Sequence, residues 1–256
     1  ATVLGMLSRM RPVSQTSSGF TCLTAAAAPF AGAFLEAIPC SAVGTRMDNS
    51  SFRIAVALRL GAEICSPHNC ICGAPVDSSG VHGLSCRKSS GRQIRHSAVN
   101  GIIKRALASA EVPARLEPSS LSRDDGKRPD GMSLMPWKEG RCLIWDFTCA
   151  DTLAQSHLDR AVLRAATVAD DAEQRKRQKY VSLSATYYFV PICIETLGPM
   201  GEEAAAFFAD VGQRIATATG EPRSKTFLMQ RLSIAVQQGN AACVLGTVPV
   251  STDLYI

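Results

Sequence analysis

Residues 128–149 read RPDGMSLMPWKEGRCLIWDFTC, two apolar segments on either side of a polar turn. The second segment, 141–149, is rich in aliphatic and aromatic residues and contains one carboxylate, which is typical of a mostly buried β-strand. The first segment, 130–135, also has the pattern of a strand. With the five residues 136–140 as a turn, the two segments are predicted to form an antiparallel hairpin.

The register of this hairpin brings two acidic side chains together. With that turn, Asp130 lies directly opposite Asp146, where like charges destabilise a sheet. Strand alternation places Asp146 on the face of Ile144 and Thr148, so its carboxylate points at an apolar surface. A divalent cation would remove the repulsion, because Mg²⁺ binds through one or two carboxylates plus waters and substrate phosphate. The pair therefore predicts a magnesium site for phosphodiester hydrolysis.

A purely structural interpretation of the two aspartates stays open. Asp130 follows Pro129 and could cap a turn, and Asp146 could pair with an arginine such as Arg128 or Arg141. The magnesium hypothesis also depends on the register, because a shift by one residue moves a side chain to the other face of the sheet.

A hydrolase of this kind needs a cation beside the attacked phosphate, to hold the nucleophile and offset negative charge. Lys176 and Lys179 lie three residues apart at the basic end of a helical pattern that follows the second strand. One of them is expected to reach back toward the carboxylates. The alternative is that both lysines reflect the preference of helix C-termini for positive charge.

The segments around the hairpin alternate between helical and extended patterns. The extended pieces 114–117 and 187–195 predict two further strands. Apolar residues at helical spacing predict helices over 31–38, 52–60, 94–110, 153–180, 202–218 and 227–237. This order predicts an α/β fold, with a small mixed sheet flanked by helices.

The composition limits the class of protein. The chain has 256 residues, of which 46% are hydrophobic and 19% charged, and the mean hydropathy is +0.07. These values exclude a disordered polyelectrolyte. No run reaches the roughly 18 apolar residues of a membrane span, so no membrane partner is expected. The net charge of +5 is too small to indicate a partner unless the basic residues are clustered.

Four of the ten cysteines and two of the four histidines lie within residues 65–86. The spacing of Cys70, Cys72, His82 and Cys86 puts two thiolates on one turn and a His/Cys pair on the next, which is the ligand set of structural zinc. Cys65 or His68 could replace one of the four. The alternative is free or disulfide-paired thiols. A reducing compartment is favoured, because ten cysteines are too few for a disulfide scaffold.

A basic segment follows the zinc motif directly. Residues 87–105 contain no acidic side chain and carry six basic ones, Arg87, Lys88, Arg92, Arg95, Lys104 and Arg105. Basic residues on a helix beside a metal module favour a phosphate-binding surface, and therefore nucleic acid as a partner. The alternative is an ordinary solvated face of a helix.

Taken in order, five motifs resemble those of the PD-(D/E)xK-type restriction-like endonuclease at the C-terminus of site-specific non-LTR retrotransposon proteins. The resemblance covers about residues 34–195. The motifs are a Cys-Cys-His-Cys knuckle (Cys70, Cys72, His82, Cys86), an Arg-His pair (Arg95, His96), Arg-Pro-Asp (Arg128 to Asp130), Asp-x-Thr (Asp146 to Thr148) and Lys-x-x-Lys-Tyr (Lys176 to Tyr180). Thr148 stands where the general motif has lysine, so the lysine is expected on the following helix.

The resemblance implies a metal-dependent DNA endonuclease that nicks target DNA to prime reverse transcription. It implies Mg²⁺ or Mn²⁺ at Asp130 and Asp146, a catalytic lysine at Lys176 or Lys179, and zinc on the knuckle. Glu117 is a further candidate metal ligand, and His96 and Arg128 are candidate DNA contacts. DNA, element RNA and an upstream reverse transcriptase region are the implied partners, with nuclear localisation.

The implied organisation has three parts, a helical or linker region (1–64), a zinc knuckle (65–93) and a restriction-like endonuclease domain (94–256). No reverse transcriptase motif occurs in the chain, so a fragment and a stand-alone copy both stay open. Two other functions also stay open. One is a nucleic-acid-binding module on a nuclease-like fold without cleavage, and the other is a structural protein with disulfides among Cys65, Cys70, Cys72 and Cys86.

Overall fold

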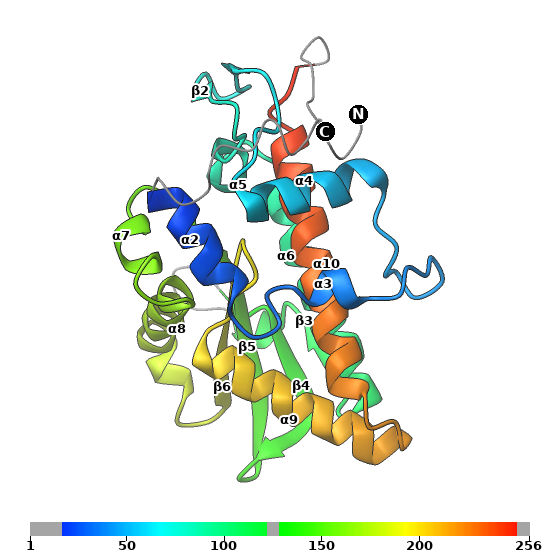
Figure 1. Cartoon of the computed structure of the whole chain (residues 1–256). Helices are drawn as coiled ribbons and strands as arrows, with labels where there is room; N and C mark the ends of the chain where they lie inside the picture. Colours follow the sequence, from blue (N-terminus) through cyan, green and yellow to red (C-terminus); the bar gives the residue numbers. More distant parts are fainter. Residues whose placement is uncertain (1–16, 122–127, 250–256) are drawn as a thin grey trace.

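A computed structural model describes residues 17–121 and 128–249, so the predicted regions 1–64 and 94–256 lie partly outside the described residues. The described elements alternate between helices and strands, as the sequence patterns predict (Figure 1). In chain order they are α2 (Ser17–Ala26), α3 (Ala33–Glu36), α4 (Asn49–Leu60), β1 (His68–Asn69), β2 (Pro75–Val76), α5 (His82–Ser85), α6 (Gly91–Ser109), β3 (Ala114–Leu116), η2 (Ser119–Leu121), β4 (Gly131–Lys138), β5 (Arg141–Ala150), α7 (Leu158–Ala161), α8 (Thr167–Lys179), η3 (Val181–Leu183), β6 (Tyr188–Glu195), α9 (Glu202–Thr219) and α10 (Ser224–Leu245).

Strands β3 to β6 form one four-stranded sheet in the order β3-β4-β5-β6. The pairs β3–β4 and β4–β5 are antiparallel, whereas β5 and β6 are parallel and joined by the crossover through α7 and α8. The sheet is therefore mixed. The predicted α/β class, with helices and a small mixed sheet, is confirmed.

The turn between β4 and β5 differs from the sequence prediction, although the register at the aspartates does not. The turn consists only of Glu139 and Gly140, both with positive φ (51° and 72°), as a tight hairpin turn requires. Two register irregularities in β4 offset the shorter turn. Gly131 consequently pairs with Trp145, the register predicted for a regular hairpin with a five-residue turn.

The two faces of the sheet are covered by different helices. One face packs against α6, α9 and α10 in the main core, where Leu143, Trp145 and Phe147 alternate along β5. The intervening Ile144 of β5 faces the other way, toward Tyr180 and Phe189, on the side that α8 covers. Alternation along β5 therefore points Asp146, next to Trp145, toward α8.

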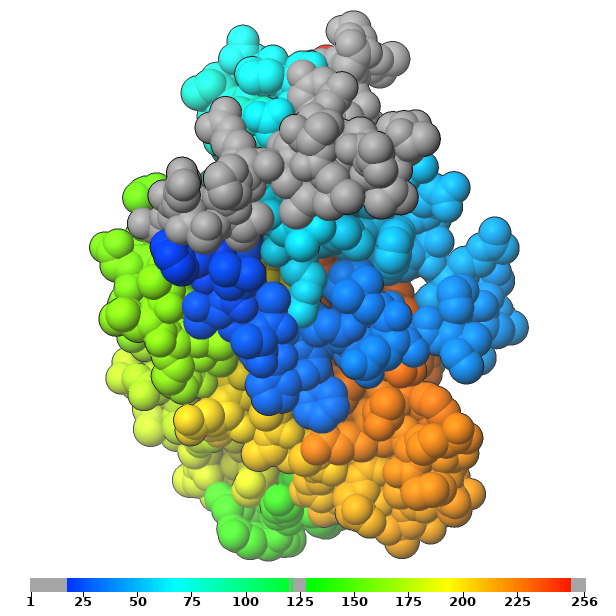
Figure 2. Space-filling view, in the orientation of Figure 1, coloured from blue at the N-terminus to red at the C-terminus, as the bar shows by residue number. Residues whose placement is uncertain are grey.

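Helix α10 connects the regions that the sequence separates. Its C-terminal half packs with Ile54 of α4 and Leu84 of α5 in a second core cluster (Figure 1). Glycines allow the close approach, because a Cβ at Gly83 or Gly91 would lie 2.6 Å or 2.4 Å from the α10 backbone at Cys243. Figure 2 shows the N-terminal helices (blue) covering the middle of one face, between α7–α8 (green) and α9–α10 (orange).

The predicted helix over 153–180 is wrong in its first half. The structure instead has the short α7 and then α8, separated by a break at Ala166 with φ of 67°. Before α7, the backbone N–H of Thr152 donates to Thr196 Oγ1 (3.1 Å), and Thr152 Oγ1 accepts from the Leu197 N–H (3.3 Å). The N–H of Leu153 also donates to Asp151 Oδ1 (3.1 Å), and such local side-chain bonds compete with helix formation. No described helix is long and apolar enough to cross a membrane.

Gly131 provides the first prediction, because the Trp145 indole occupies the space of its missing side chain. A Cβ at Gly131 would lie 2.0 Å from Trp145 Cζ2. We expect Gly131→Ala to destabilise the fold by about 1–3 kcal/mol, the usual cost of overpacking a core. Urea unfolding measures the change.

The control is Gly101→Ala on α6, where the added Cβ would meet only the flexible end of Arg105. Alanine is the better helix former, so this variant should be neutral or gain up to about 1 kcal/mol. Equal stability of Gly131→Ala and the wild-type protein would contradict the close Trp145 contact.

Candidate active site and metal centre

The Cys/His cluster is built by a small hairpin and a short helix. Cys70 and Cys72 lie in the turn between β1 and β2, where Gly73 has φ of 89°, while His82 begins α5 and Cys86 ends it. The four ligand atoms lie within 4.8 Å of one another. Cys70 Sγ and Cys86 Sγ are 3.7 Å apart, and Cys72 Sγ and His82 Nε2 are 3.2 Å apart.

These separations fit a tetrahedral metal site. Zn–S bonds of about 2.3 Å and Zn–N bonds of about 2.0 Å put ligand atoms roughly 3.3–3.8 Å apart. A backbone hydrogen bond at Ala74 is the largest cause that lowers the pKa of Cys72 to about 7, which favours the thiolate that a metal requires. The cluster can therefore hold a metal ion such as zinc.

The two other residues considered for this site lie elsewhere. Cys65 Sγ donates to the Asp77 carbonyl (3.7 Å), and His68 Nε2 lies 3.3 Å from Thr247 Oγ1. The described cysteines are all unpaired thiols, and the Cys70–Cys86 separation is well beyond a disulfide bond of about 2.05 Å. The structure therefore favours Cys70, Cys72, His82 and Cys86 as the ligands over a disulfide network.

The two aspartates meet at the end of the β4–β5 hairpin. The N–H of Asp130 donates to the Trp145 carbonyl (2.9 Å), so Asp130 lies directly before the Gly131–Trp145 pair at the end of the ladder, and Asp146 follows that pair on β5. Asp130 Oδ2 accepts the N–H of Phe147 (2.6 Å) and lies 3.1 Å from His96 Nε2. Asp146 is only 4% exposed, and its Oδ2 accepts a hydrogen bond from Lys176. A histidine from α6 and a lysine from α8 thus contact one carboxylate each.

The two carboxyl groups have opposite pKa shifts. Burial raises the pKa of Asp146, and the neighbouring charge of Asp130 raises it further, while Lys176 acts against both. Burial also acts to raise the pKa of Asp130, but the hydrogen bond and charge of His96 outweigh it and lower the pKa. Pairs of carboxyl groups with such separated pKa values are typical of functional sites.

Of the two candidate lysines, Lys176 is the one on the carboxylates. Lys179 Nζ instead donates to Tyr180 Oη (2.9 Å) and lies 4.4 Å from the centre of the Tyr180 ring. The buried Tyr180 in turn donates its hydroxyl proton to the Arg128 carbonyl (3.1 Å). Lys179 and Tyr180 therefore tie the end of α8 to the segment that leads into Asp130.

A buried glutamate fixes the position of α8. Glu173 accepts N–H groups from Cys193 of β6 and from Glu203 and Ala204 of α9, at 3.0–3.3 Å. Gly201 leaves the necessary room, because a Cβ there would lie 2.2 Å from Glu173 Cδ. Burial raises the pKa of Glu173 to about 7. Since Lys176 lies one turn further along α8, Glu173 sets where Lys176 can reach.

A hydrogen-bond chain through Asn100 fixes the tautomer of His96. Trp145 Nε1 can only donate, and it lies 2.8 Å from Asn100 Oδ1, so the amide group Nδ2 of Asn100 faces His96 Nδ1 (3.3 Å). Nδ1 must therefore accept, and the proton sits on Nε2, which donates to Asp130. The hydrogen bond to Asp130 raises the pKa of His96, whereas burial lowers it.

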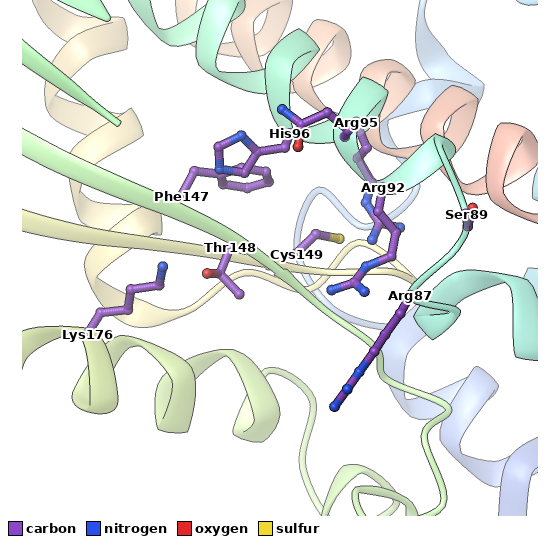
Figure 3. Close-up of a pocket in the computed structure, with 10 residues that line it drawn as sticks. Arg87, Ser89, Arg92, Arg95, His96, Phe147, Thr148, Cys149 and Lys176 are labelled. Atoms are coloured by element: carbon purple, nitrogen blue, oxygen red, sulfur yellow. The ribbon is translucent and has the colours of Figure 1, made fainter. Parts of the chain in front are cut away.

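A pocket of about 430 Å³ opens beside the aspartates, between the start of α6, the end of β5 and α8 (Figure 3). No acidic residue is among those that line it, and Arg87 and Arg92 form no ion pair with any described residue. Arg95 is 3% exposed and donates to Asn240 Oδ1 (2.5 Å), so it is anchored to α10 at the pocket wall. The lining residues are Arg87, Ser89, Arg92, Gln93, Arg95, His96, Phe147, Thr148, Cys149 and Lys176.

The other basic candidates do not join this pocket. Lys88 Nζ donates to the Ile71 carbonyl in the knuckle (3.3 Å). Lys104 and Arg105 are exposed on the C-terminal half of α6. Arg128 pairs with Glu117. Of the six basic residues of the predicted surface, therefore, only Arg87, Arg92 and Arg95 line the pocket beside the aspartates.

Glu117 reaches the aspartates with its backbone rather than its carboxylate. Its N–H donates to the Asp130 carbonyl (2.8 Å), which aligns the end of β3 with the corner of the hairpin. The Glu117 side chain is 67% exposed and pairs with Arg128. Glu117 and Arg128 thus lie beside the aspartates with their charges paired to each other.

Three residues of this site were missed in the sequence. Asn100 and Glu173 are polar residues at helix positions that turn inward, and the helical spacing of their neighbours could have placed both on buried faces. Phe147 packs its ring 5.7 Å from His96, and no sequence pattern indicates that contact.

The metal centre yields a prediction on zinc content. Native mass spectrometry should find one zinc ion per chain, which Cys86→Ser removes because it deletes one of four ligands. Cys65→Ser is the matched control, since Cys65 lies outside the cluster, and it should keep the ion. Loss of zinc in both variants, or no zinc in the wild-type protein, would contradict this ligand set.

The His96 tautomer yields a second prediction for this site. Asn100→Asp replaces the facing donor with an acceptor, so His96 should gain a proton on Nδ1 and its pKa should rise by at least about one unit. Side-chain ¹⁵N NMR reports both changes. Gln213→Glu adds the same charge to the exposed side of α9 and should change neither. An Nδ1–H tautomer in the wild-type protein would refute the chain through Asn100.

Comparison with known proteins identifies no relative. No protein-family model matches the sequence, and no curated protein matches it. The functional meaning of the resemblance to restriction-like endonucleases therefore depends on the residues themselves and on how the fold arranges them. The carboxylates, Lys176, His96 and the pocket lie together, and the metal cluster directly precedes the basic segment whose first half lines that pocket.

Proposed function

We propose that the protein is a Mg²⁺- or Mn²⁺-dependent endonuclease that nicks DNA by phosphodiester hydrolysis, within or derived from a non-LTR retrotransposon protein. One observation carries the proposal: the opposed carboxylates of Asp130 and Asp146 lie beside Lys176 and a pocket that exposes Arg87 and Arg92. This reaction needs carboxylates that bind a metal ion, and it needs a lysine and arginines that bind phosphate.

The donor set fits a divalent metal. Among the described residues, no hydrogen-bond donor contacts Oδ1 of either Asp130 or Asp146, whereas each Oδ2 is engaged. Two carboxylate oxygens are thus available, and Mg²⁺ usually takes one or two carboxylates together with waters and substrate phosphate. When bound there, Mg²⁺ would activate a water for attack and offset the charge of the leaving oxygen.

The side chains around the carboxylates have separate tasks in this proposal. His96 donates to Asp130 Oδ2 and so orients that carboxylate. Lys176 lines the pocket and would offset negative charge on the attacked phosphate. Arg87 and Arg92 would hold the neighbouring phosphates of the strand, because a guanidinium group binds phosphate through two parallel hydrogen bonds.

The zinc knuckle would act as a platform rather than as a catalyst in this function. It packs against the end of α10 through Gly83, and Lys88 bonds back to it directly before α6. A folded knuckle therefore fixes the position of the basic residues at the start of α6. Element RNA, an upstream reverse transcriptase region and the nucleus remain the partners and the location that this function implies.

A second candidate function is nucleic-acid binding without cleavage. The ion pair between Lys176 and Asp146 favours it, since this pair, together with His96 at Asp130, offsets the carboxylate charges without a metal. This alternative keeps the knuckle and the arginines but predicts that substitution of either aspartate leaves DNA binding intact and that no cleavage occurs.

Nicking of supercoiled plasmid in Mg²⁺ tests the proposal. We expect the wild-type protein to nick, and Asp130→Ala and Asp146→Ala to lose at least about a hundredfold of the rate, because each removes a proposed metal ligand. Asp159→Ala, at an exposed position of α7, is the control and should nick normally. Nicking by the aspartate variants at the wild-type rate would end the assignment, and DNA binding without nicking by any form would favour the alternative.

A further inference from the structure

A second pocket lies on the opposite side of α6 from His96. It has a volume of about 220 Å³ and is formed by α6, α10 and the loop at Val43 and Gly44. Nine residues separate His96 from Arg105, which at 100° per residue puts the two side chains about 180° apart around the helix. The pocket is therefore separate from the carboxylate site.

Two arginines from different helices face this pocket. Arg105 belongs to α6 and Arg231 to α10, and both line the cavity. Burial lowers the pKa of Arg231, and the positive charge of Arg105 lowers it further. Two guanidinium groups that line one cavity repel each other, and a bound anion would offset this repulsion.

No acidic side chain supplies that anion. The lining residues other than the arginines are neutral, and neither guanidinium forms an ion pair or a side-chain hydrogen bond within the described parts of the chain. Ile102, Ile234 and Ala235 give the cavity an apolar wall, which strengthens any charge interaction inside it. A compact anion with several acceptor oxygens, such as a phosphate group, would satisfy both arginines.

We propose that Arg105 and Arg231 form a phosphate-binding site that holds a nucleic-acid backbone away from the point of cleavage. The phosphate site rests on the two arginines, whereas the choice of nucleic acid as its source rests on the proposed function. Arg105 lies about 13 Å along α6 from His96. The same helix therefore offers one basic face to the cut strand and another to a more distant phosphate.

The experiment uses the full chain without added Mg²⁺, so that binding is measured apart from cleavage. Anisotropy of a labelled DNA duplex gives the affinity of wild-type protein, Arg105→Gln and Arg231→Gln over a range of salt concentrations. Each variant should reduce the slope of log affinity against log salt by about one, because each loses one phosphate contact. Arg53→Gln is the control, since Arg53 is exposed on α4, and its slope should stay at the wild-type value.

Inorganic phosphate, followed by NMR of the arginine side chains, tests the site directly. We expect it to shift the Nε–Hε signals of Arg105 and Arg231 but not that of Arg53. No shift of either signal would overturn the proposal. Phosphate binding with an unchanged duplex slope would overturn the nucleic-acid contact in favour of a small phosphorylated ligand. Loss of affinity for an acidic peptide, but not for the duplex, would overturn it in favour of a protein partner.

A failure of the cleavage proposal gives a different result. Arg105 and Arg231 lie outside the carboxylate site, and the salt slope and the phosphate shifts are both measured without cleavage, so the two proposals are tested separately. If the protein does not nick DNA but shows the slope change and the phosphate shifts, the phosphate site is supported and the endonuclease proposal is wrong. If the protein nicks DNA but shows neither effect, the endonuclease proposal is supported and the phosphate site is wrong.

Discussion

Repulsion between two neighbouring carboxylates is the constraint on which this structure depends. Asp146 is buried on β5 and Asp130 is half-buried directly before β4, close enough for its charge to raise the pKa of Asp146. Two charges about 5 Å apart in an effective dielectric of about 20 repel by about 3 kcal/mol. That is a substantial part of the roughly 5–15 kcal/mol by which a domain is usually stable. Such an arrangement persists only if neighbouring groups offset it, and the Nε2–H of His96 and the charge of Lys176 do so from opposite sides of the sheet.

The surrounding fold holds the His96 and Lys176 side chains in place. On the α6 side, Gly131 leaves room for the Trp145 indole, which orients Asn100, and Asn100 in turn orients His96. On the α8 side, Glu173 anchors the helix to β6 and α9, so that Lys176 meets Asp146. Residues without any direct contact to substrate thereby determine the charge and direction of the groups that would contact it.

The sequence predicted the class of fold and the Cys/His cluster, because strand alternation and ligand spacing are local patterns. It predicted the pairing of Gly131 with Trp145 correctly but the length of the turn wrongly. No local pattern shows the irregularities in β4 that offset the short turn at Glu139. It also missed the break at Ala166, where φ is 67°, and the bonds between Thr152 and Thr196 in the segment before α7. Asn100 and Arg231 depend on tertiary contacts, which no spacing within one segment reveals.

The central claim is that the two carboxylates bind one divalent ion together. Electron paramagnetic resonance of Mn²⁺, titrated into the zinc-loaded protein, counts bound ions independently of any cleavage. One Mn²⁺ per chain that is lost in both Asp130→Asn and Asp146→Asn, while the zinc stays bound, is the result expected here. Mn²⁺ binding that is absent from the wild-type protein, or that survives both substitutions, would contradict the claim.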